Sequence, residues 1–169
     1  ISKAKEIFWK SILKEVEKIT KNKGLNFIMN KQLIDEVVNL VESPNVFLGQ
    51  FDKKYLKLPN EVLTTSMIKN QKYFPLFYKD KTLSNFFIIV SNLKPSDNGK
   101  KIIYGNQRVI EARLEDASFF WIKDNNSNFK DKGEELKRII FHNKLGSMYD
   151  KILRLKKIAT FFDENIKLD

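Results

Sequence analysis

Apolar side chains recur at helical spacing near the start of the chain. Phe8, Ile12, Val16 and Ile19 lie three or four residues apart, which is the spacing of one face of an amphipathic helix. Gly24 follows this pattern, and glycine commonly ends a helix because it adopts a left-handed backbone without strain. The pattern therefore predicts a leading helix that stops at Gly24.

A second helical pattern and a short strand follow. Asn30 is a suitable N-cap and Pro44 ends the segment, because proline cannot continue a helix. The run from Val46 to Phe51 is apolar and rich in strand-forming residues. The apolar positions of the second helix are Leu33, Ile34, Val37, Val38 and Val41.

The middle of the chain predicts a helix followed by a β-hairpin. Pro59 suits the first turn of a helix that extends to about Asn70. Residues 73–78 and 86–90 are aromatic and β-branched, and the polar stretch 79–84 separates them. Both strands are apolar at successive positions, so we expect both sheet faces to be covered. Pro75 places its strand at an edge or a bulge.

The remainder of the chain predicts helices after a turn-rich loop at residues 94–99. Residues 124–128 interrupt the first two helices. The three apolar stripes are Ile110, Leu114, Ala117 and Trp121; Leu136, Ile139 and Ile140; and Met148, Ile152, Leu155, Ala159 and Phe162.

These elements define an α+β fold, in which a small, mostly antiparallel sheet packs with several amphipathic helices and the C-terminal part is helical. We expect three segments: a leading amphipathic helix at 1–24, an α+β core domain at 25–122, and C-terminal helices at 129–169 that lead towards a further domain.

Composition supports a folded domain and excludes several classes of protein. The 169 residues are 42% hydrophobic and 12% aromatic, enough for one domain with a real core. The sequence has no apolar run long enough to cross a bilayer and no signal-peptide pattern, so we expect no membrane partner. Because the first residue is Ile1, we expect an excerpt of a longer polypeptide.

The chain has no cysteine and a single histidine, His142. Disulfides, thiolate nucleophiles and cysteine-based zinc sites are therefore excluded, and the composition suits a cytosolic protein. One histidine leaves no His-rich metal site. We place His142 near the end of a helix, on the surface, without a catalytic role.

The formal charge of +10 favours polyanionic partners such as RNA or DNA. Of the 31 basic residues only four are arginines, and lysine is scattered along the whole length. A uniformly lysine-rich surface is often only a solvated one. Charge alone leaves specific nucleic-acid binding and simple solvation equally open.

The most informative patch is the stretch 66–76, in which Gln71-Lys72-Tyr73 lies where a helix meets an aromatic strand. A cation at the end of a helix stabilises the helix dipole, and this alone accounts for Lys72. Alternatively, Gln71 and Tyr73 read or stack on a base while Lys72 neutralises a phosphate. Both interpretations stay open.

A second patch begins at Gly105 and carries two arginines. Arg113 and Asp116 are three residues apart on one helical face, which predicts a structural ion pair. The alternative is that Arg108 and Arg113 contact phosphate. Arg108 stays open, because Glu111 is only a loose surface partner for it.

A third patch lies at the start of the last helix. Ser147 and Asp150 have the spacing of a capping box, which explains both without a function. Lys151 is the remaining RNA-binding candidate of the patch. The sequence contains no phosphate-cradling glycine loop, no HExxH, no nucleophile elbow and no acidic metal cluster, so we expect no catalytic residue and no metal site.

The order of these motifs resembles the β subunit family of bacterial heterotetrameric glycyl-tRNA synthetases. The similarity extends from Leu33 to about Arg154. Its motifs are 33–44, 49–51, 55–59, 66–67, 71–75, 85–86, 91–92, 105–109, 112–120 and 145–151.

The resemblance implies a role in aminoacylation without catalysis by this piece. In such enzymes the α subunit carries the class II site that activates glycine with ATP and magnesium, and the β subunit serves tRNA engagement and assembly. The implied partners are the α subunit, tRNA-Gly and the remaining β domains, in the cytoplasm. We expect no cofactor in this piece.

Three hypotheses follow. The first is a tRNA-engaging and subunit-organising part of the glycine–tRNA ligase β subunit. The second is a purely structural scaffold in the same subunit, and the third is an unrelated basic RNA-binding module. The RNA-binding candidates are Gln71, Lys72, Tyr73, Arg108, Arg113 and Lys151.

Overall fold

A computed structural model describes residues 2–165 of the chain, without the side chains of residues 2–4, 129 and 130. Ile1, at the start of the first predicted segment, and residues 166–169, at the end of the last one, lie outside the described residues. The chain divides into two compact units, Ile1–Trp121 and Ile122–Asp169, which we call unit 1 and unit 2.

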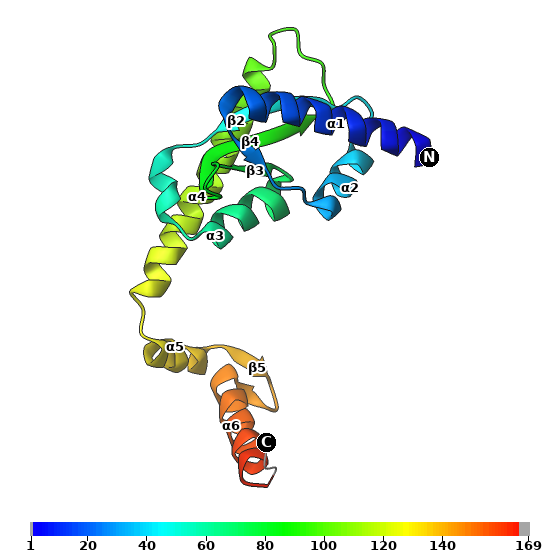
Figure 1. The fold of residues 1–169 in the computed structure, drawn as a ribbon. Helices are drawn as coiled ribbons and strands as arrows, with labels where there is room; N and C mark the ends of the chain where they lie inside the picture. The colour runs from blue at the N-terminus through cyan, green and yellow to red at the C-terminus, as the bar shows by residue number, and fades with distance from the viewer. Residues whose placement is uncertain (1, 166–169) are drawn as a thin grey trace. The chain divides into compact units, whose positions relative to one another are not determined.

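Unit 1 is built around a four-stranded antiparallel sheet (Figure 1). The strand order is β1-β3-β4-β2, so the predicted hairpin of β3 and β4 forms its centre. Sheet and helices together confirm the α+β class. The strands are β1 (Asn26–Phe27), β2 (Asn45–Gln50), β3 (Phe74–Phe77) and β4 (Leu83–Ser91).

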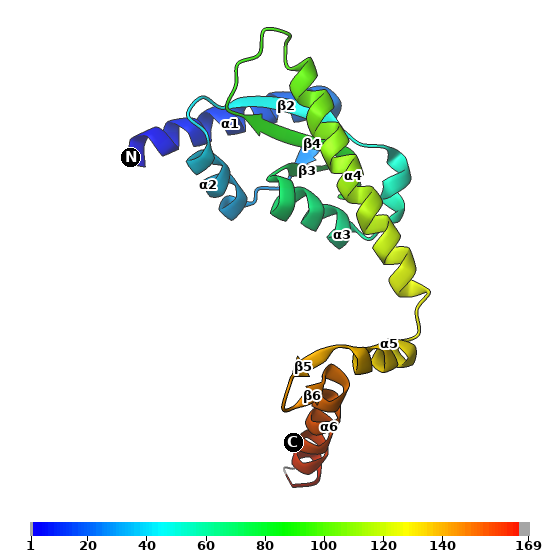
Figure 2. The same cartoon turned by 180° about the vertical axis from the view of Figure 1, so that it is seen from behind.

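Helices cover both faces of this sheet. Helices α1 (Ser2–Lys23) and α2 (Lys31–Leu40) lie on one face (Figure 1). The other face, seen in Figure 2, carries α4 and the segments that precede β3. These are the 3₁₀ helix η1 (Lys53–Lys57), α3 (Asn60–Thr65), its π-helical continuation η2 (Ser66–Asn70), and α4 (Lys100–Asn125).

Strand alternation divides the core into two clusters. Because successive side chains of a strand point to opposite faces, Ile88 of β4 packs with α1 and α2, whereas Phe87 and Ile89 pack with α3 and α4. All three side chains are buried. The prediction that both faces of the hairpin are covered is therefore confirmed.

The helix boundaries near the N-terminus follow the predicted signals. Gly24 has a φ of 64° directly after α1. The side-chain oxygen of Asn30 accepts a hydrogen bond from the Leu33 N–H at 3.0 Å, which caps α2. Both predictions are confirmed.

Pro75 lies at a bulge, as predicted. The register between β3 and β4 shifts between Pro75 and Phe77. The short strand β1 pairs only with Leu76 and Phe77, so the outer edge of β3 at Pro75 has no strand beside it. Proline has no N–H to donate there, and this part of the sheet edge is unsuited to further pairing.

Helix α4 is tied to the sheet side of unit 1 by polar contacts. Gln107 donates through Nε2 to the Gln50 carbonyl at 2.6 Å, and the Tyr55 hydroxyl donates to Glu115 at 2.6 Å. At its start, the Asp97 carboxylate accepts from the Lys101 N–H at 3.0 Å. These contacts fix the helix that carries both candidate arginines.

Unit 2 contains a helix, a small hairpin and a second helix. Its elements are α5 (Phe129–Glu135), the 3₁₀ turn η3 (Leu136–Arg138), β5 (Ile140–His142), β6 (Gly146–Ser147) and α6 (Met148–Asn165). Residues 126–128 separate α4 from α5, which agrees with the predicted interruption.

The predicted helical stripe through Leu136, Ile139 and Ile140 is wrong. Leu136 lies in η3, and Ile140 begins β5, which pairs with β6. The run of two isoleucines and Phe141 is β-branched and aromatic, and Gly146 with a φ of 80° closes the turn that follows. Strand preference and turn chemistry outweigh the apparent helical spacing here.

The predicted capping box at the start of α6 is confirmed. Ser147 Oγ accepts from the Asp150 N–H at 3.2 Å, and Asp150 accepts from the Ser147 N–H at 2.7 Å. This reciprocal pair holds down the pKa of the Asp150 carboxyl, chiefly through the backbone N–H of Ser147. Both residues are therefore explained by helix initiation.

Candidate nucleic-acid interface

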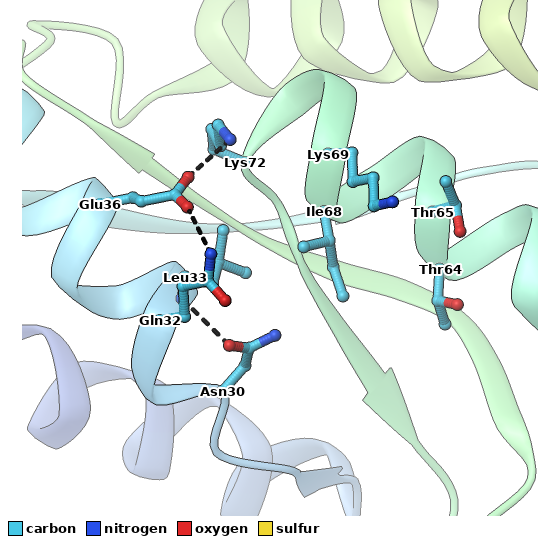
Figure 3. Close-up of a pocket in the computed structure, with 9 residues that line it drawn as sticks. All are labelled: Asn30, Gln32, Leu33, Glu36, Thr64, Thr65, Ile68, Lys69 and Lys72. Atoms are coloured by element: carbon cyan, nitrogen blue, oxygen red, sulfur yellow. Dashed lines mark hydrogen bonds and ion pairs between the residues drawn. The ribbon is translucent and has the colours of Figure 1, made fainter.

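The candidate site is a groove in unit 1 between α2 and the α3–η2 segment. Its first part is a cavity of about 300 Å³ (Figure 3). Side chains from the two elements face one another across it. The lining residues are Asn30, Gln32, Leu33 and Glu36 on the α2 side, and Thr64, Thr65, Ile68, Lys69 and Lys72 on the other. We call this cavity the polar half of the groove.

The backbone between η2 and β3 positions Lys72 at the groove. The π-helical turn ends at Asn70, and Lys72 then adopts a φ of 59°, a left-handed conformation that a lysine rarely takes. The Tyr73 N–H donates back to the Met67 carbonyl at 2.9 Å, which closes the turn. Widened helical turns and strained residues recur at functional sites.

An ion pair joins the two walls of the polar half. Lys72 Nζ lies 2.6 Å from Glu36 Oε2, and Gln32 Nε2 lies 3.4 Å from the other oxygen of Glu36. The hydrogen bond and the charge of Lys72 lower the pKa of the Glu36 carboxyl below its ordinary value. Both side chains of the pair are 39% exposed, so the pair is accessible to solvent and to ligands.

Lys69 provides a second cation on the same wall. Its side chain is exposed, and none of the ion pairs among the described residues involves it. Thr65 beside it is also exposed. Thr64 Oγ1 donates to the Asn60 carbonyl at 2.8 Å, so its lone pairs stay available as acceptors.

An apolar cavity of about 260 Å³ continues the groove. It shares Asn30, Leu33, Thr64 and Ile68 with the polar half, and Ile28, Phe74, Pro75 and Phe77 complete its lining. The last three belong to β3, in which Phe77 pairs with β1 whereas the edge at Phe74 and Pro75 has no partner strand. We call this cavity the apolar half of the groove.

Of the predicted candidates, only Lys72 lines the groove. Gln71 is partly exposed directly before it, and its backbone N–H donates to the Ile68 carbonyl as the cap of η2. Lys72 therefore lies near the end of η2, as the dipole interpretation expects, and it also forms an ion pair with Glu36.

Tyr73 is not placed to stack on a base. Its side chain is buried, its ring stacks on Phe87 with centroids 4.8 Å apart, and its hydroxyl donates to Asn106 Oδ1 at 2.6 Å. Burial raises the pKa of the Tyr73 phenol to about 12. The structure therefore corrects the stacking interpretation: Tyr73 links the sheet to α4.

The two arginines lie on α4, away from the residues that line the groove. Arg108 is exposed, and its guanidinium carbon lies 5.9 Å from the centre of the Tyr104 ring. Arg113 and Asp116 are both exposed, and no ion pair joins them among the described residues. An exposed pair gains too little Coulomb energy to immobilise two side chains.

Lys151 and His142 belong to unit 2. Lys151 Nζ lies 4.4 Å from the centre of the Phe141 ring, which is a cation–π distance. His142 is exposed in β5, not at a helix end as expected, and its Nδ1 accepts from the Lys144 N–H at 3.2 Å. Within the described part of the chain, no group of three metal-ligating side chains gathers.

Sequence reasoning missed Glu36, Lys69 and the two threonines as groove residues. Helical spacing assigns Glu36 to the exposed side of α2, and nothing in the local sequence indicates that η2 lies opposite. The available signal is Lys69, which lies within the stretch 66–76, two residues before Gln71.

Comparison with known proteins identifies the family of the chain. The family model described as "Glycyl-tRNA synthetase beta subunit" matches residues 6–168. Because the match covers nearly the whole chain, the protein belongs to the glycyl-tRNA synthetase beta subunit family.

Individual relatives are named glycine–tRNA ligase beta subunits. The glycine–tRNA ligase beta subunit of Syntrophomonas wolfei is 41% identical over 160 residues, which is 94% of this chain. That of Streptococcus agalactiae is 41% identical over 157 residues and 93% of the chain, and that of a Thermotoga species is 38% identical over 160 residues and 94% of the chain. In each case the chain spans 23% of the relative's length.

No helix among residues 2–165 combines the length and the apolar character that crossing a membrane requires.

Proposed function

We propose that this chain is the part of a glycine–tRNA ligase β subunit that engages tRNA and organises its neighbours in the complex. The observation that carries the proposal is the groove of unit 1, where Lys69 and Lys72 stand on one wall of a partly apolar cleft. The net charge of +10 adds long-range attraction for a polyanion.

The catalytic step is assigned elsewhere. ATP-dependent activation of glycine, with magnesium, belongs in this proposal to a class II site on the α subunit of a cytoplasmic heterotetramer. In this proposal the chain binds the tRNA and orients it, and correct orientation raises the rate at which glycine is transferred to the tRNA.

A scaffold role is the second candidate, and specific contacts favour it. Tyr73 bonds to Asn106, Gln107 bonds to the Gln50 carbonyl, and buried Asn85 donates to the Phe51 carbonyl at 2.7 Å. All these amides and the phenol hold elements of unit 1 together, so they are explained without RNA. The cations Lys69 and Arg108 are not explained in this way.

Aminoacylation separates the two candidates. The complete β subunit that carries this chain, assembled with its α partner, would be assayed for glycylation of tRNA-Gly with Lys72→Gln and Arg108→Gln. If the proposal holds, the KM for tRNA rises several-fold while the rate of glycyl-adenylate formation without tRNA stays unchanged.

The matched control is Lys53→Gln, an exposed lysine in η1 that lines neither half of the groove. Unchanged KM for tRNA in the Lys72 and Arg108 variants would favour the scaffold role. Loss of adenylate formation would place these residues near the α subunit's chemistry and contradict the proposed division of labour.

A further inference from the structure

Two halves of one groove present different chemistry to a ligand. The polar half offers Lys69, Lys72 and the hydroxyl of Thr65, whereas the apolar half offers Ile28 and Pro75. Four residues line both halves, so a single ligand can reach from one to the other. The combined shape suits a small unit with an anionic end and a flat apolar end.

One nucleotide of a single strand has this composition. Its phosphate requires cations and hydrogen-bond donors, and its base gains from burial against apolar surface once it has left a stack. A base in a duplex cannot enter, because its faces are covered by its neighbours in the stack. Cavities of about 300 and 260 Å³ fit one nucleotide and not a helix of RNA.

We propose that the groove binds one unstacked nucleotide of single-stranded RNA, with its phosphate at Lys69 and Lys72 and its base in the apolar half. This inference rests on the proposed function and names the part of the RNA that the site takes. The occupant is argued from charge complementarity, since Lys69 has no acidic partner among the described residues.

Glu36 has a second role in this proposal. Its carboxylate oxygen lies 2.6 Å from the Lys72 ammonium, in the place that the proposal gives to a phosphate oxygen. Binding therefore exchanges one anion for another at the same ammonium group. Glu36 competes with RNA, and it also rejects ligands that lack an anion to replace it.

The two partners of this ion pair therefore predict effects of opposite sign. Lys72→Gln removes a phosphate contact and weakens RNA binding, whereas Glu36→Gln releases Lys72 and strengthens it by about threefold, the magnitude expected for an exposed pair. A purely structural ion pair predicts the same sign for both, because either change breaks the same contact between α2 and the turn that joins η2 to β3.

The experiment measures binding of a fluorescent oligoadenylate of about twelve nucleotides to the complete protein with its α partner. An abasic ribose-phosphate oligomer of equal length and charge is the second probe, and a blunt RNA duplex is the third. We expect the abasic strand to bind at least about fivefold more weakly than the oligoadenylate, because one base loses its burial.

Substitutions of the exposed side chains Ile28 and Lys69 test the two halves of the groove with little effect on stability. Ile28→Ser should remove most of the preference for the strand with bases, whereas Leu93→Ser, at an exposed leucine in the loop before α4, should not. Lys69→Gln should weaken both single strands equally and flatten their salt dependence by about 0.7 in log–log slope.

The outcomes separate this inference from the function on which it rests. Equal binding of both single strands, with an effect of Lys69→Gln on each, overturns the base site but leaves phosphate contact and tRNA engagement intact. The inference is also overturned if the Glu36→Gln variant binds the oligoadenylate more weakly than the native protein does. If neither Lys69→Gln nor Ile28→Ser changes binding of any RNA, the groove serves another occupant, such as a peptide segment, and both proposals fail at this site.

Discussion

Units 1 and 2 differ most in what they bury. In unit 1 the sheet is packed on both faces, and Phe51, Phe74 and Phe87 are each 1% exposed or less. Among the described side chains of unit 2 none is buried, and Ile140, Phe161 and Phe162 are at least half exposed. The first unit therefore has its own hydrophobic core, whereas the described residues of the second form none.

The difference indicates where function can reside in the isolated chain. A groove keeps its shape only when its walls are fixed, and α2, α3 and β3 all contribute to the core clusters of unit 1. The apolar side chains of α6 are available for burial against further protein surface. Unit 1 is thus expected to be the stable part and unit 2 the dependent part.

The largest expected effect comes from comparing one phenylalanine substitution in each unit. Phe87→Ala should lower the free energy of unfolding of unit 1 by about 3–5 kcal/mol, because Phe87 is fully buried between Phe51 and Tyr73. Phe161→Ala in α6 should change it by less than about 0.5 kcal/mol, because its side chain is 60% exposed. Urea denaturation followed by circular dichroism checks both values, and a comparable loss in the two variants would refute the contrast.

A smaller effect is expected at the tie between the sheet and α4. Tyr73→Phe removes the hydrogen bond to Asn106 and should cost about 1 kcal/mol in unfolding free energy. The pH dependence has a definite sign. Because the pKa of Tyr73 is raised from 10.0 to about 12, its contribution is complete below pH 10 and is lost as pH rises through 12.

The measurement for Tyr73 is unfolding free energy against pH for the native protein and for Tyr73→Phe. The two curves should converge above pH 10. Parallel curves over the whole range would mean that this phenol ionises as readily in the folded protein as in the unfolded one.

Helix caps should matter more where there is no core. Ser147→Ala removes the hydroxyl that caps α6 and should cost about 1 kcal/mol of local stability. Because α6 has no buried side chain among its described residues, that loss should appear as faster amide hydrogen exchange through the first turns of α6. Asn30→Ala at the cap of α2 is the matched variant, and faster exchange in α2 than in α6 would contradict the comparison.

The smallest effect concerns acid pH at the groove. The pKa of Glu36 is lowered by Lys72, so the ion pair stabilises unit 1 fully above the ordinary carboxyl pKa of 4.5 and is lost as pH falls below it. Glu36→Gln should remove this part of the acid dependence. An identical acid limb in the native protein and the variant would show that the pair does not contribute.

Local patterns were sufficient to predict much of unit 1. The stripe from Phe8 to Ile19, the cap at Asn30 and the bulge at Pro75 each depend on residues close in sequence, and the structure confirms them. Strand β1 was not predicted, because a two-residue strand has no periodicity. The β5–β6 hairpin was missed because two isoleucines three and four residues after Leu136 also satisfy a helical spacing.

The site was less predictable, since it depends on residues far apart in the chain. Tyr73 carries a phenol beside a cation, and only its bond to Asn106, 33 residues later, reveals that it faces the core. The ion pair between Lys72 and Glu36 likewise spans 36 residues. Of the six RNA-binding candidates only Lys72 lines the groove, and the other lining residues come together because α2 lies opposite the α3–η2 segment.

The salt dependence of tRNA-Gly binding to the complete protein tests the central claim most directly. The account predicts that the double variant Lys69→Gln, Lys72→Gln binds tRNA more weakly. Its log–log salt slope should be shallower by about one to two units, because fewer counterions are released on binding when phosphate contacts are lost. The double variant Lys53→Gln, Lys57→Gln, with the same charge change in η1, should keep the native slope. Equal slopes in the two double variants would contradict the account.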